Sequence, residues 1–320
     1  MRVIVTGGAG FIGGNFIRYM LKKYNKYEFI NLDKLTYAGN LKSIEDLLKY
    51  PNYKFVQGDI ADKQVLQDLM PGVDAIINFA AESHVDRSID GPEVFVLTNV
   101  LGTQVLLEAA RKHKVSKFVQ ISTDEVYGSL GADGLFTELT PIAPSSPYSA
   151  SKASADLLVY SYYHTYGMDV SITRCSNNYG PYQHLEKLIP SFITKAIKDR
   201  PLPIYGDGLN IRDWLYVDDH CSAIDLVLHS GQPGEVYNIG GNNEHANLEI
   251  TKIILSALGK SEDLIEYVTD RPGHDRRYAI DSTKIRTQLG WNPQYNFEEG
   301  IQETIEWYKN NTNWVEGGGK

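Results

Sequence analysis

The sequence predicts an α/β protein with a doubly wound parallel sheet and a smaller C-terminal α/β lobe. Short apolar runs alternate with helical patterns through the first half of the chain, and a glycine-rich turn separates the first apolar run from the first helical pattern. A β–α–β–α order places the strands parallel, with crossover helices between them. The 320 residues, 42% hydrophobic and 22% charged, suffice for two globular lobes.

The apolar runs predict six strands, at Val3–Val5, Phe29–Leu32, Tyr53–Val56, Ala75–Phe79, Phe118–Ile121 and Val170–Thr173. Beyond about residue 175 the pattern is irregular and rich in Pro and Gly, with helical stretches at 188–198, 219–229, 248–258 and 297–309. We expect a first domain over residues 1–175 and a second lobe over 176–312, with an interleaved boundary because an extended segment can return to the sheet. Residues 313–320 are expected to form a flexible tail.

The glycine-rich turn predicts a dinucleotide site. Gly7 and Gly10 can adopt backbone angles closed to other residues and let the chain approach a pyrophosphate, while Gly13 lets the helix pack closely on the sheet. The N-terminus of that helix favours phosphate. Asp33 follows Gly13 by 20 residues, the spacing of the carboxylate that binds the adenosine ribose hydroxyls. A carboxylate there would repel a 2′-phosphate, so the pattern favours NAD over NADP and a Rossmann domain.

Bulk properties exclude several other classes of protein. The formal net charge of −9 argues against nucleic-acid binding. No apolar stretch approaches 18 residues and no basic leader precedes the first strand, so we expect neither a membrane span nor secretion. The only cysteines, Cys175 and Cys221, form no disulfide framework, which fits a reducing cytoplasm.

No metal site is expected either. His84 and Asp86 are too few to hold an ion. The string Asp218–His220 is better explained as acids at a helix start, where they complement the helix dipole.

Tyr148 and Lys152 are four residues apart and would share one face of a helix. A lysine ammonium and a nicotinamide cation would both lower the pKa of the tyrosine, which could then take a proton from a sugar hydroxyl as hydride leaves its carbon. The same spacing occurs at Tyr19/Lys23 and Tyr50/Lys54, which we interpret as surface pairs. Only Tyr148 follows the fifth predicted strand, whose carboxyl end faces the nicotinamide in a Rossmann domain.

Adjacent acids, Asp124 and Glu125, follow Thr123 at the end of the fifth strand. Simple hydride transfer has no use for two carboxyl groups. An elimination requires one acid to protonate a leaving hydroxyl and one base to remove a proton, and unlike surroundings can separate the two pKa values. The alternative is that the two acids merely begin a loop.

Four segments together resemble the extended short-chain dehydrogenase/reductases, and the Thr-Asp-Glu string within them resembles the dTDP-glucose 4,6-dehydratase family. The segments are Thr6–Gly13, Ala80–Ser88, Ser122–Gly128 and Tyr148–Lys152. The resemblance covers residues 1 to about 310. It implies a homodimer, with contacts through helices near residues 93–113 and 149–166, and the segment 129–140 is shorter than in longer members.

The resemblance also implies roles for individual residues. Thr123, Asp124, Glu125, Tyr148 and Lys152 would be catalytic. NAD would be lined by Gly7, Gly10, Phe11, Ile12, Gly13, Asp33, Lys34, Leu35, Thr36, Asp59, Ile60, Ala80, Ala81, Ser83, Thr98, Tyr148, Lys152 and Asn178.

The second lobe would bind the nucleotide-sugar substrate, dTDP-glucose. Arg212 and Arg271 would hold the diphosphate, because guanidinium groups bind phosphate oxygens in bidentate fashion. The other implied substrate residues are Ser83, Thr123, Asn177, Lys187, Leu188, Pro203, Tyr205, Asn247 and His274.

Two alternatives remain open. A nucleotide-sugar 4-epimerase or decarboxylase would also oxidise carbon 4 but would not require the pair of acids. A non-enzymatic NAD-binding scaffold would not require Tyr148 and Lys152, and both are present.

Overall fold

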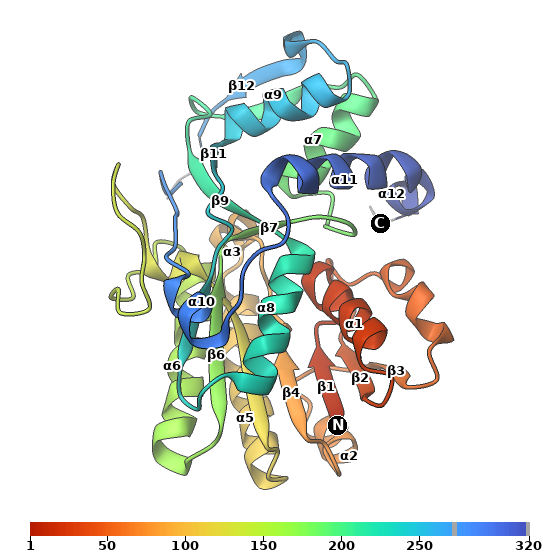
Figure 1. Cartoon of the computed structure of the whole chain (residues 1–320), viewed down its shortest axis with the longest axis vertical. Coiled ribbons are helices and arrows are strands. Elements are labelled where there is room, and N and C mark those ends of the chain that lie inside the picture. The colour runs from red at the N-terminus through yellow and green to blue at the C-terminus, as the bar shows by residue number, and fades with distance from the viewer. Residues whose placement is uncertain (271–273, 318–320) are drawn as a thin grey trace.

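The computed structural model describes residues 1–270 and 274–317 and has two lobes, the larger one below and the smaller one above in Figure 1. The larger lobe is built on a seven-stranded sheet in the order β10-β6-β5-β4-β1-β2-β3, and every pair in it is parallel. Its strands are β1 (Arg2–Thr6), β2 (Glu28–Asp33), β3 (Tyr53–Gln57), β4 (Ala75–Asn78), β5 (Lys117–Thr123), β6 (Val170–Cys175) and β10 (Val236–Ile239).

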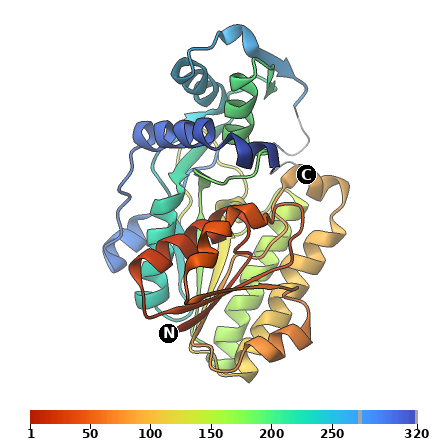
Figure 2. The ribbon, with the colours of Figure 1, turned by 90° about the vertical axis from the view of Figure 1, so that its right-hand side faces the viewer.

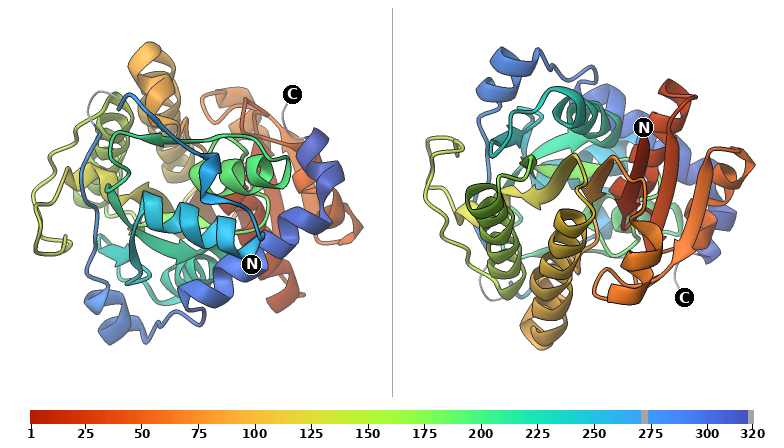
Figure 3. Two further views of the ribbon diagram at one scale, coloured as in Figure 1. Left: turned by 90° about the horizontal axis from the view of Figure 1, so that it is seen from above. Right: turned by 90° about the horizontal axis from the view of Figure 1, so that it is seen from below.

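Alternate residues of the strands feed two separate cores, because successive side chains of a strand point to opposite faces. Val3 and Val5 pack on the face covered by α1 (Phe11–Lys23) and α8 (Val217–Ser230). Ile4 packs on the other face with α2 (Lys63–Leu69), α5 (Thr103–Lys112) and α6 (Pro147–Tyr166). Figure 3, from below, shows these helices on both sides of the sheet. The predicted doubly wound α/β architecture is confirmed.

Helix α6 carries clear start and stop signals. Ser146 caps it in a capping box with Ser149, Pro147 occupies its first turn, and Gly167 ends it in the left-handed conformation with φ 67°. These local signals fix where Tyr148 begins the helix beside the end of β5.

The smaller lobe, at the top of Figure 2, has an apolar core of its own, formed by residues of its helices and short strands. Its strands pair as β11-β9-β7 and as β12-β8. Their bounds are β7 (Asn177–Tyr179), β8 (Leu202–Tyr205), β9 (Ile211–Tyr216), β11 (Glu244–Ala246) and β12 (Ile265–Val268), and the main helices are α7 (Leu188–Ile197), α9 (Asn247–Ala257) and α11 (Phe297–Asn310).

The chain passes between the lobes more than once. After β7, α7, β8 and β9 it returns with α8 and β10, and β10 forms the edge of the large sheet beside β6. Helix α10 (Thr283–Leu289) then packs on β10 and α8. Residues of the second half therefore complete the first lobe, and the split at residue 175 does not divide the lobes in space.

The prediction of a flexible tail from residue 313 is wrong for the described part of that tail. Residues Thr312–Gly317 form helix α12, and Trp314 and Val315 pack against the core of the smaller lobe. The indole Nε1 of Trp314 also donates to Oγ of Ser43 in the larger lobe, at 3.0 Å. Residues 318–320 of the predicted tail lie outside the described residues.

One continuous helical stretch is more apolar than the sequence analysis expected. It runs over Glu93–Lys112 through α4 (Glu93–Phe95), the π-helical segment η3 (Val96–Gly102) and α5, and by length and composition alone it could cross a membrane, although such a helix is weak evidence. It alternates buried residues with exposed ones, and 44% of its most apolar window is buried in the fold. Leu106 and Leu107 face the core, whereas Val96, Leu97 and Leu101 are about half exposed.

Candidate functional site

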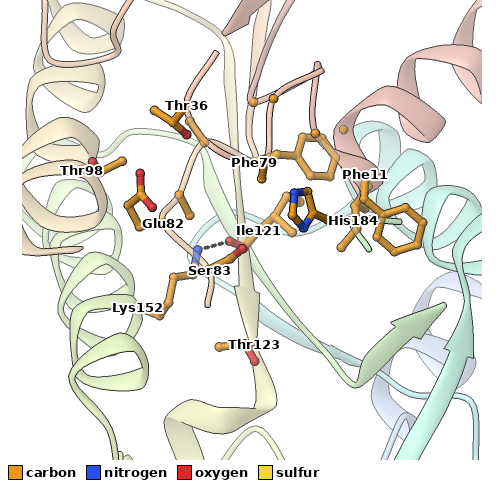
Figure 4. Close-up of a pocket in the computed structure, with 18 of the residues that line it drawn as sticks. Phe11, Thr36, Phe79, Glu82, Ser83, Thr98, Ile121, Thr123, Lys152 and His184 are labelled. Atoms are coloured by element: carbon orange, nitrogen blue, oxygen red, sulfur yellow. Dashed lines mark hydrogen bonds between the residues drawn. The ribbon is translucent and has the colours of Figure 1, made fainter. Parts of the chain in front are cut away.

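A cavity opens at the carboxyl ends of β1, β2, β4, β5 and β6, where a Rossmann sheet binds its ligand (Figure 4). All five predicted catalytic residues line it. Of the predicted cofactor residues, only Leu35 lies outside the lining, because its side chain packs against the core beside α1. Ser83, Thr123, Asn177 and Lys187 are the predicted substrate residues that line it.

The glycine turn leaves no room for side chains. Gly7 has φ 68°, and a Cβ there would lie 2.7 Å from the backbone nitrogen of Ala80. A Cβ on Gly13 would lie 2.5 Å from the carbonyl oxygen of Gly7. The turn is therefore pressed against the β4 loop and against its own helix, which fits the close backbone approach that a pyrophosphate requires.

Two carboxylates, of Asp33 and Asp59, line the cavity at the ends of β2 and β3. Asp33 accepts from the backbone N–H groups of Ala9 and Leu35, at 2.9 and 2.8 Å, while burial raises its pKa. Asp59 pairs with the ammonium of Lys34 at 2.7 Å. Burial raises the pKa of Asp59, but its hydrogen bonds and the charge of Lys34 together outweigh burial, so the pKa is lowered overall. Carboxylate oxygens can accept further bonds, so the residues present fit a ribose and an adenine amino group.

Lys152 reaches from α6 to the end of β5. Its buried ammonium donates to the carbonyl of Ile121 at 2.7 Å, the dashed line of Figure 4. Burial lowers the pKa of Lys152, and the negative charge of the nearby Asp156 partly offsets this lowering. One turn earlier, Tyr148 is held edge-to-face against Phe95, with ring centroids 6.3 Å apart.

The electrostatics of Tyr148 differ from the sequence-based expectation. Burial raises the pKa of its hydroxyl well above the ordinary value, the charge of Glu125 raises it further, and a hydrogen bond with Thr123 lowers it. The side chains of this chain therefore hold the tyrosine neutral, and Lys152 alone does not bring its pKa toward neutrality.

The acids that follow β5 lie in different surroundings. Asp124 is 2% exposed, whereas Glu125 is half-buried. Burial, Glu125 and Asp213 together raise the pKa of Asp124 well above the ordinary value. Thr123 Oγ1 donates to Asp124 at 3.3 Å and caps the short helix η4 (Asp124–Tyr127) by accepting from the backbone of Glu125. Asp124 therefore binds its proton more tightly than an exposed carboxylic acid does, and it lies beside a more exposed carboxyl group.

Arg212 of β9 lies near these acids rather than at the surface. It is 6% exposed, donates to the carbonyl of Asp275 at 2.9 Å, and stacks its guanidinium 4.4 Å from the ring centre of Tyr278. Burial raises the pKa values of Asp124 and Tyr278, and the charge of Arg212 partly offsets that rise in both. This predicted phosphate partner therefore belongs to the smaller lobe and lies close enough to the end of β5 to affect the pKa of Asp124.

The remaining predicted substrate residues lie in the second lobe, outside the cavity lining. Tyr205 ends β8 and meets His274 edge-to-face at 6.2 Å, and His274 contacts Asp270 at 2.6 Å. Pro203 lies in β8, while Leu188 and Asn247 begin α7 and α9. Arg271 lies outside the described residues.

The structure adds cavity residues that the sequence analysis did not single out: Glu82, His184 and Glu186. Glu186 lies 3.7 Å from His84 Nε2 and 3.6 Å from Arg87 Nε, while the neighbouring Lys187 donates to the carbonyl of Ser83 at 3.1 Å. Their positions beside Ser83 and Lys187 in the sequence were the only available signal.

Within residues 1–270 and 274–317, no group of three or more His, Cys, Asp or Glu side chains is arranged to hold a metal ion. Asp219 instead accepts from the backbone N–H groups of Gln294 and Tyr295, at 2.7 and 3.0 Å. Cys175 and Cys221 are free and buried.

Comparisons with known proteins agree with this geometry. The family model described as GDP-mannose 4,6 dehydratase matches residues 4–304. A dTDP-glucose 4,6-dehydratase of Xanthomonas campestris pv. campestris is 53% identical, covering 98% of this chain and 95% of that protein. The low-salt glycan biosynthesis protein Agl12 of Haloferax volcanii is 56% identical, and the match covers 96% of this chain and 98% of that protein.

A solved structure is equally similar. DesIV, a dTDP-glucose 4,6-dehydratase from Streptomyces venezuelae solved with NAD bound, superposes with a TM-score of 0.96 at 51% identity, covering 98% of each chain. The chain therefore belongs to the dTDP-glucose 4,6-dehydratases, within the extended short-chain dehydrogenase/reductases.

Proposed function

We propose that this chain is an NAD-dependent dTDP-glucose 4,6-dehydratase, a hydro-lyase that forms dTDP-4-keto-6-deoxyglucose for deoxysugar (rhamnose-type) biosynthesis. The observation that carries the proposal is the pair at the end of β5: a buried Asp124 with a raised pKa beside the more exposed Glu125, in one cavity with Tyr148 and Lys152. Relatives of this name are about half identical over nearly the whole chain.

The first step is oxidation at carbon 4 of the glucose. NAD, when bound, supplies a hydride acceptor and donor and a cationic ring beside Tyr148. Tyr148 takes the proton of the carbon-4 hydroxyl, which Thr123 also binds. Because burial and Glu125 raise the pKa of Tyr148, its ionisation depends on added positive charge, and Lys152 at the end of β5 contributes part of it.

The second step is loss of water across carbons 5 and 6. The carbon-4 ketone makes the hydrogen on carbon 5 acidic, and Glu125 removes it. Asp124 donates a proton to the hydroxyl that leaves carbon 6. The raised pKa of Asp124 favours the protonated form that a general acid needs, while Glu125 would act as the base. Carbon 6 would then accept a hydride from the reduced cofactor, and return of a proton to carbon 5 by Glu125 would complete the product.

The cofactor is proposed to occupy the groove from the glycine turn to Asn178, with Asp33 on its ribose. The dTDP-glucose is proposed to reach into the second lobe, with Arg212, Arg271 and Lys187 as cations for the diphosphate, and with Ser83, Asn177, Leu188, Pro203, Tyr205, Asn247 and His274 completing the pocket. The local cations offset the chain's net charge of −9 where an anionic substrate binds.

The test is incubation of the purified protein with dTDP-glucose and, separately, UDP-glucose, followed by mass analysis. Loss of one water from dTDP-glucose supports the proposal. A product of unchanged mass that chromatography separates from the substrate would indicate a 4-epimerase. A parallel incubation with a nucleotide-linked uronic acid tests the decarboxylase alternative, which predicts loss of carbon dioxide. If the protein binds NAD but leaves both substrates unaltered, the result supports the alternative of a non-enzymatic NAD-binding scaffold.

We also propose that the enzyme is a cytoplasmic homodimer. Val96, Leu97 and Leu101 on the 93–112 stretch and Leu157 and Tyr160 on α6 are exposed apolar side chains on two helical segments that pack together. Exposed apolar side chains on neighbouring helices favour association with a second copy. Two buried thiols that form no disulfide fit a reducing compartment.

A further inference from the structure

His220 is a buried imidazole that no step above uses. It lies in the first turn of α8, is 0% exposed, and its Nδ1 lies 2.9 Å from Oδ1 of Asn178. Asn178 is on β7, which runs beside β9 just before α8, and it lines the cofactor cavity. The contact therefore joins a helix outside the cavity to a side chain on its wall.

The bond defines the tautomer of the histidine. Oδ1 of Asn178 can only accept, so Nδ1 of His220 carries the hydrogen and donates it. Nε2 then presents a bare lone pair, and among the described residues it has no hydrogen-bond partner. A buried acceptor without a partner costs stability. An apolar side chain would avoid that cost, so packing alone gives no reason for an imidazole here.

Asn178 is fixed at several points. Its Nδ2 donates to the carbonyl of Ser176 at 2.9 Å, and its own carbonyl accepts from Nε2 of Gln183 at 2.8 Å. With His220 on Oδ1, both ends of the side-chain amide are held by the protein. Each amide atom retains capacity for one further bond, directed by the bonds already made.

We propose that His220 is a positioning residue whose Nδ1–H holds the side-chain amide of Asn178 in the orientation that binds the cofactor. The inference rests on the proposed function, since it takes Asn178 to contact NAD. Burial lowers the pKa of His220 to about 3, so the imidazole stays neutral and the bond persists across the working pH range.

Matched substitutions separate the hydrogen bond from the packing. His220→Asn places an amide N–H where Nδ1 stands, His220→Gln places one nearer to Nε2, and His220→Leu fills the space without a donor. His229→Leu is the control, because His229 lies on the same helix, contacts Asp225 and Tyr27, and does not line the cavity. The measurements are the NAD dissociation rate, kcat and KM for dTDP-glucose, and the melting temperature.

We expect His220→Leu and His220→Gln to raise the NAD dissociation rate by about 10-fold or more, with KM for dTDP-glucose within about 2-fold of wild type. His220→Asn is expected to restore most of the retention. The double variant His220→Leu/Asn178→Ala should release NAD at nearly the same rate as Asn178→Ala alone, because both substitutions remove the same contact.

Unchanged NAD dissociation in His220→Leu would overturn the proposal, as would equal losses in His220→Asn and His220→Leu, which would indicate packing. The proposal would also be overturned if the effects of His220→Leu and Asn178→Ala on the NAD dissociation rate were fully additive. If the wild type itself neither binds NAD nor dehydrates dTDP-glucose, the proposed function fails instead. If His220→Leu does not fold, the comparison of His220→Asn with His220→Gln decides.

Discussion

Glu125 and Asp124 are neighbours in sequence, yet one is half-buried and the other nearly inaccessible. The reason is local: Thr123 ends β5 and caps η4, so successive residues turn away from the strand in different directions. Their proposed roles can be separated by isosteric substitutions that remove charge and keep shape.

Glu125→Gln should stop proton removal at carbon 5 and leave oxidation at carbon 4 intact. We expect product formation to fall by about 10²–10⁴-fold, the range for loss of a general base. Stopped-flow absorbance should still show nicotinamide reduction, and deuterium from solvent should not enter the sugar. Normal product formation would contradict the assignment of Glu125 as the base.

Asp124→Asn should slow elimination more than oxidation, since an amide cannot supply an acidic proton. A single-turnover experiment that follows both steps measures the difference. If both steps slow equally, Asp124 does not serve as the acid.

The same substitution has a pH-dependent effect on stability. Asp124 has a raised pKa in the folded protein, so the folded state binds more protons than the unfolded state between the ordinary pKa and the raised one. The contribution of Asp124 to stability is therefore full below about pH 4 and falls as pH rises. Asp124→Asn removes that loss, so urea unfolding should show the stability of the variant rising relative to wild type as the pH increases above about 4. A constant difference would contradict the raised pKa.

At the scale of elements, helix α12 connects the two lobes. Trp314 lies in an aromatic cluster with Tyr182, Trp307 and Tyr308, at centroid distances of 5.9, 5.2 and 6.2 Å, and it bonds Ser43 of the other lobe. Ser43 follows the Thr36–Gly39 part of the cavity wall, and Tyr182 precedes Gln183 and His184 on the opposite wall. Figure 3, from above, shows α12 lying over the N-terminal segments.

Trp314→Ala should therefore weaken the packing behind two parts of the cavity lining, the one near Ser43 and the one near Tyr182. We expect the free energy of unfolding to fall by about 1–3 kcal/mol, given a partly buried indole and one hydrogen bond, and NAD retention to decrease. Trp314→Phe keeps the ring contacts and loses only the bond to Ser43, so chemical denaturation should place it between wild type and Trp314→Ala. Equal stability of all three proteins would show that α12 contributes nothing.

Elements with local signals could be predicted from the sequence. The glycine turn, the spacing to Asp33 and the six predicted strands depend on short-range pattern, and the structure has strands at all six positions. Strand β10 and helix α12 carry no comparable signal, because their stability comes from contacts with residues far away in sequence. The same holds for the site: residues within motifs line the cavity, whereas Glu82, Glu186 and the His220–Asn178 bond depend on tertiary packing.

At the scale of the whole molecule, the exposed side chains of the 93–112 stretch and α6 test the proposed dimer. Leu97→Glu would bury a charge in an apolar interface, and light scattering should then report a monomer. Leu139→Glu is the control, because Leu139 is 94% exposed and belongs to neither helical segment. A wild type that is already monomeric, or a dimer that persists in Leu97→Glu, would contradict the interface.

The return of β10 to the large sheet limits how this protein can be divided. A fragment that ends at residue 175 lacks both β10 and α8, so β6 becomes an unprotected edge and one face of the sheet loses a covering helix. Such a fragment should aggregate. Chimaeras that exchange specificity between relatives should instead transplant three separate segments, roughly 177–216, 241–278 and 295–317, and leave α8, β10 and α10 with their host.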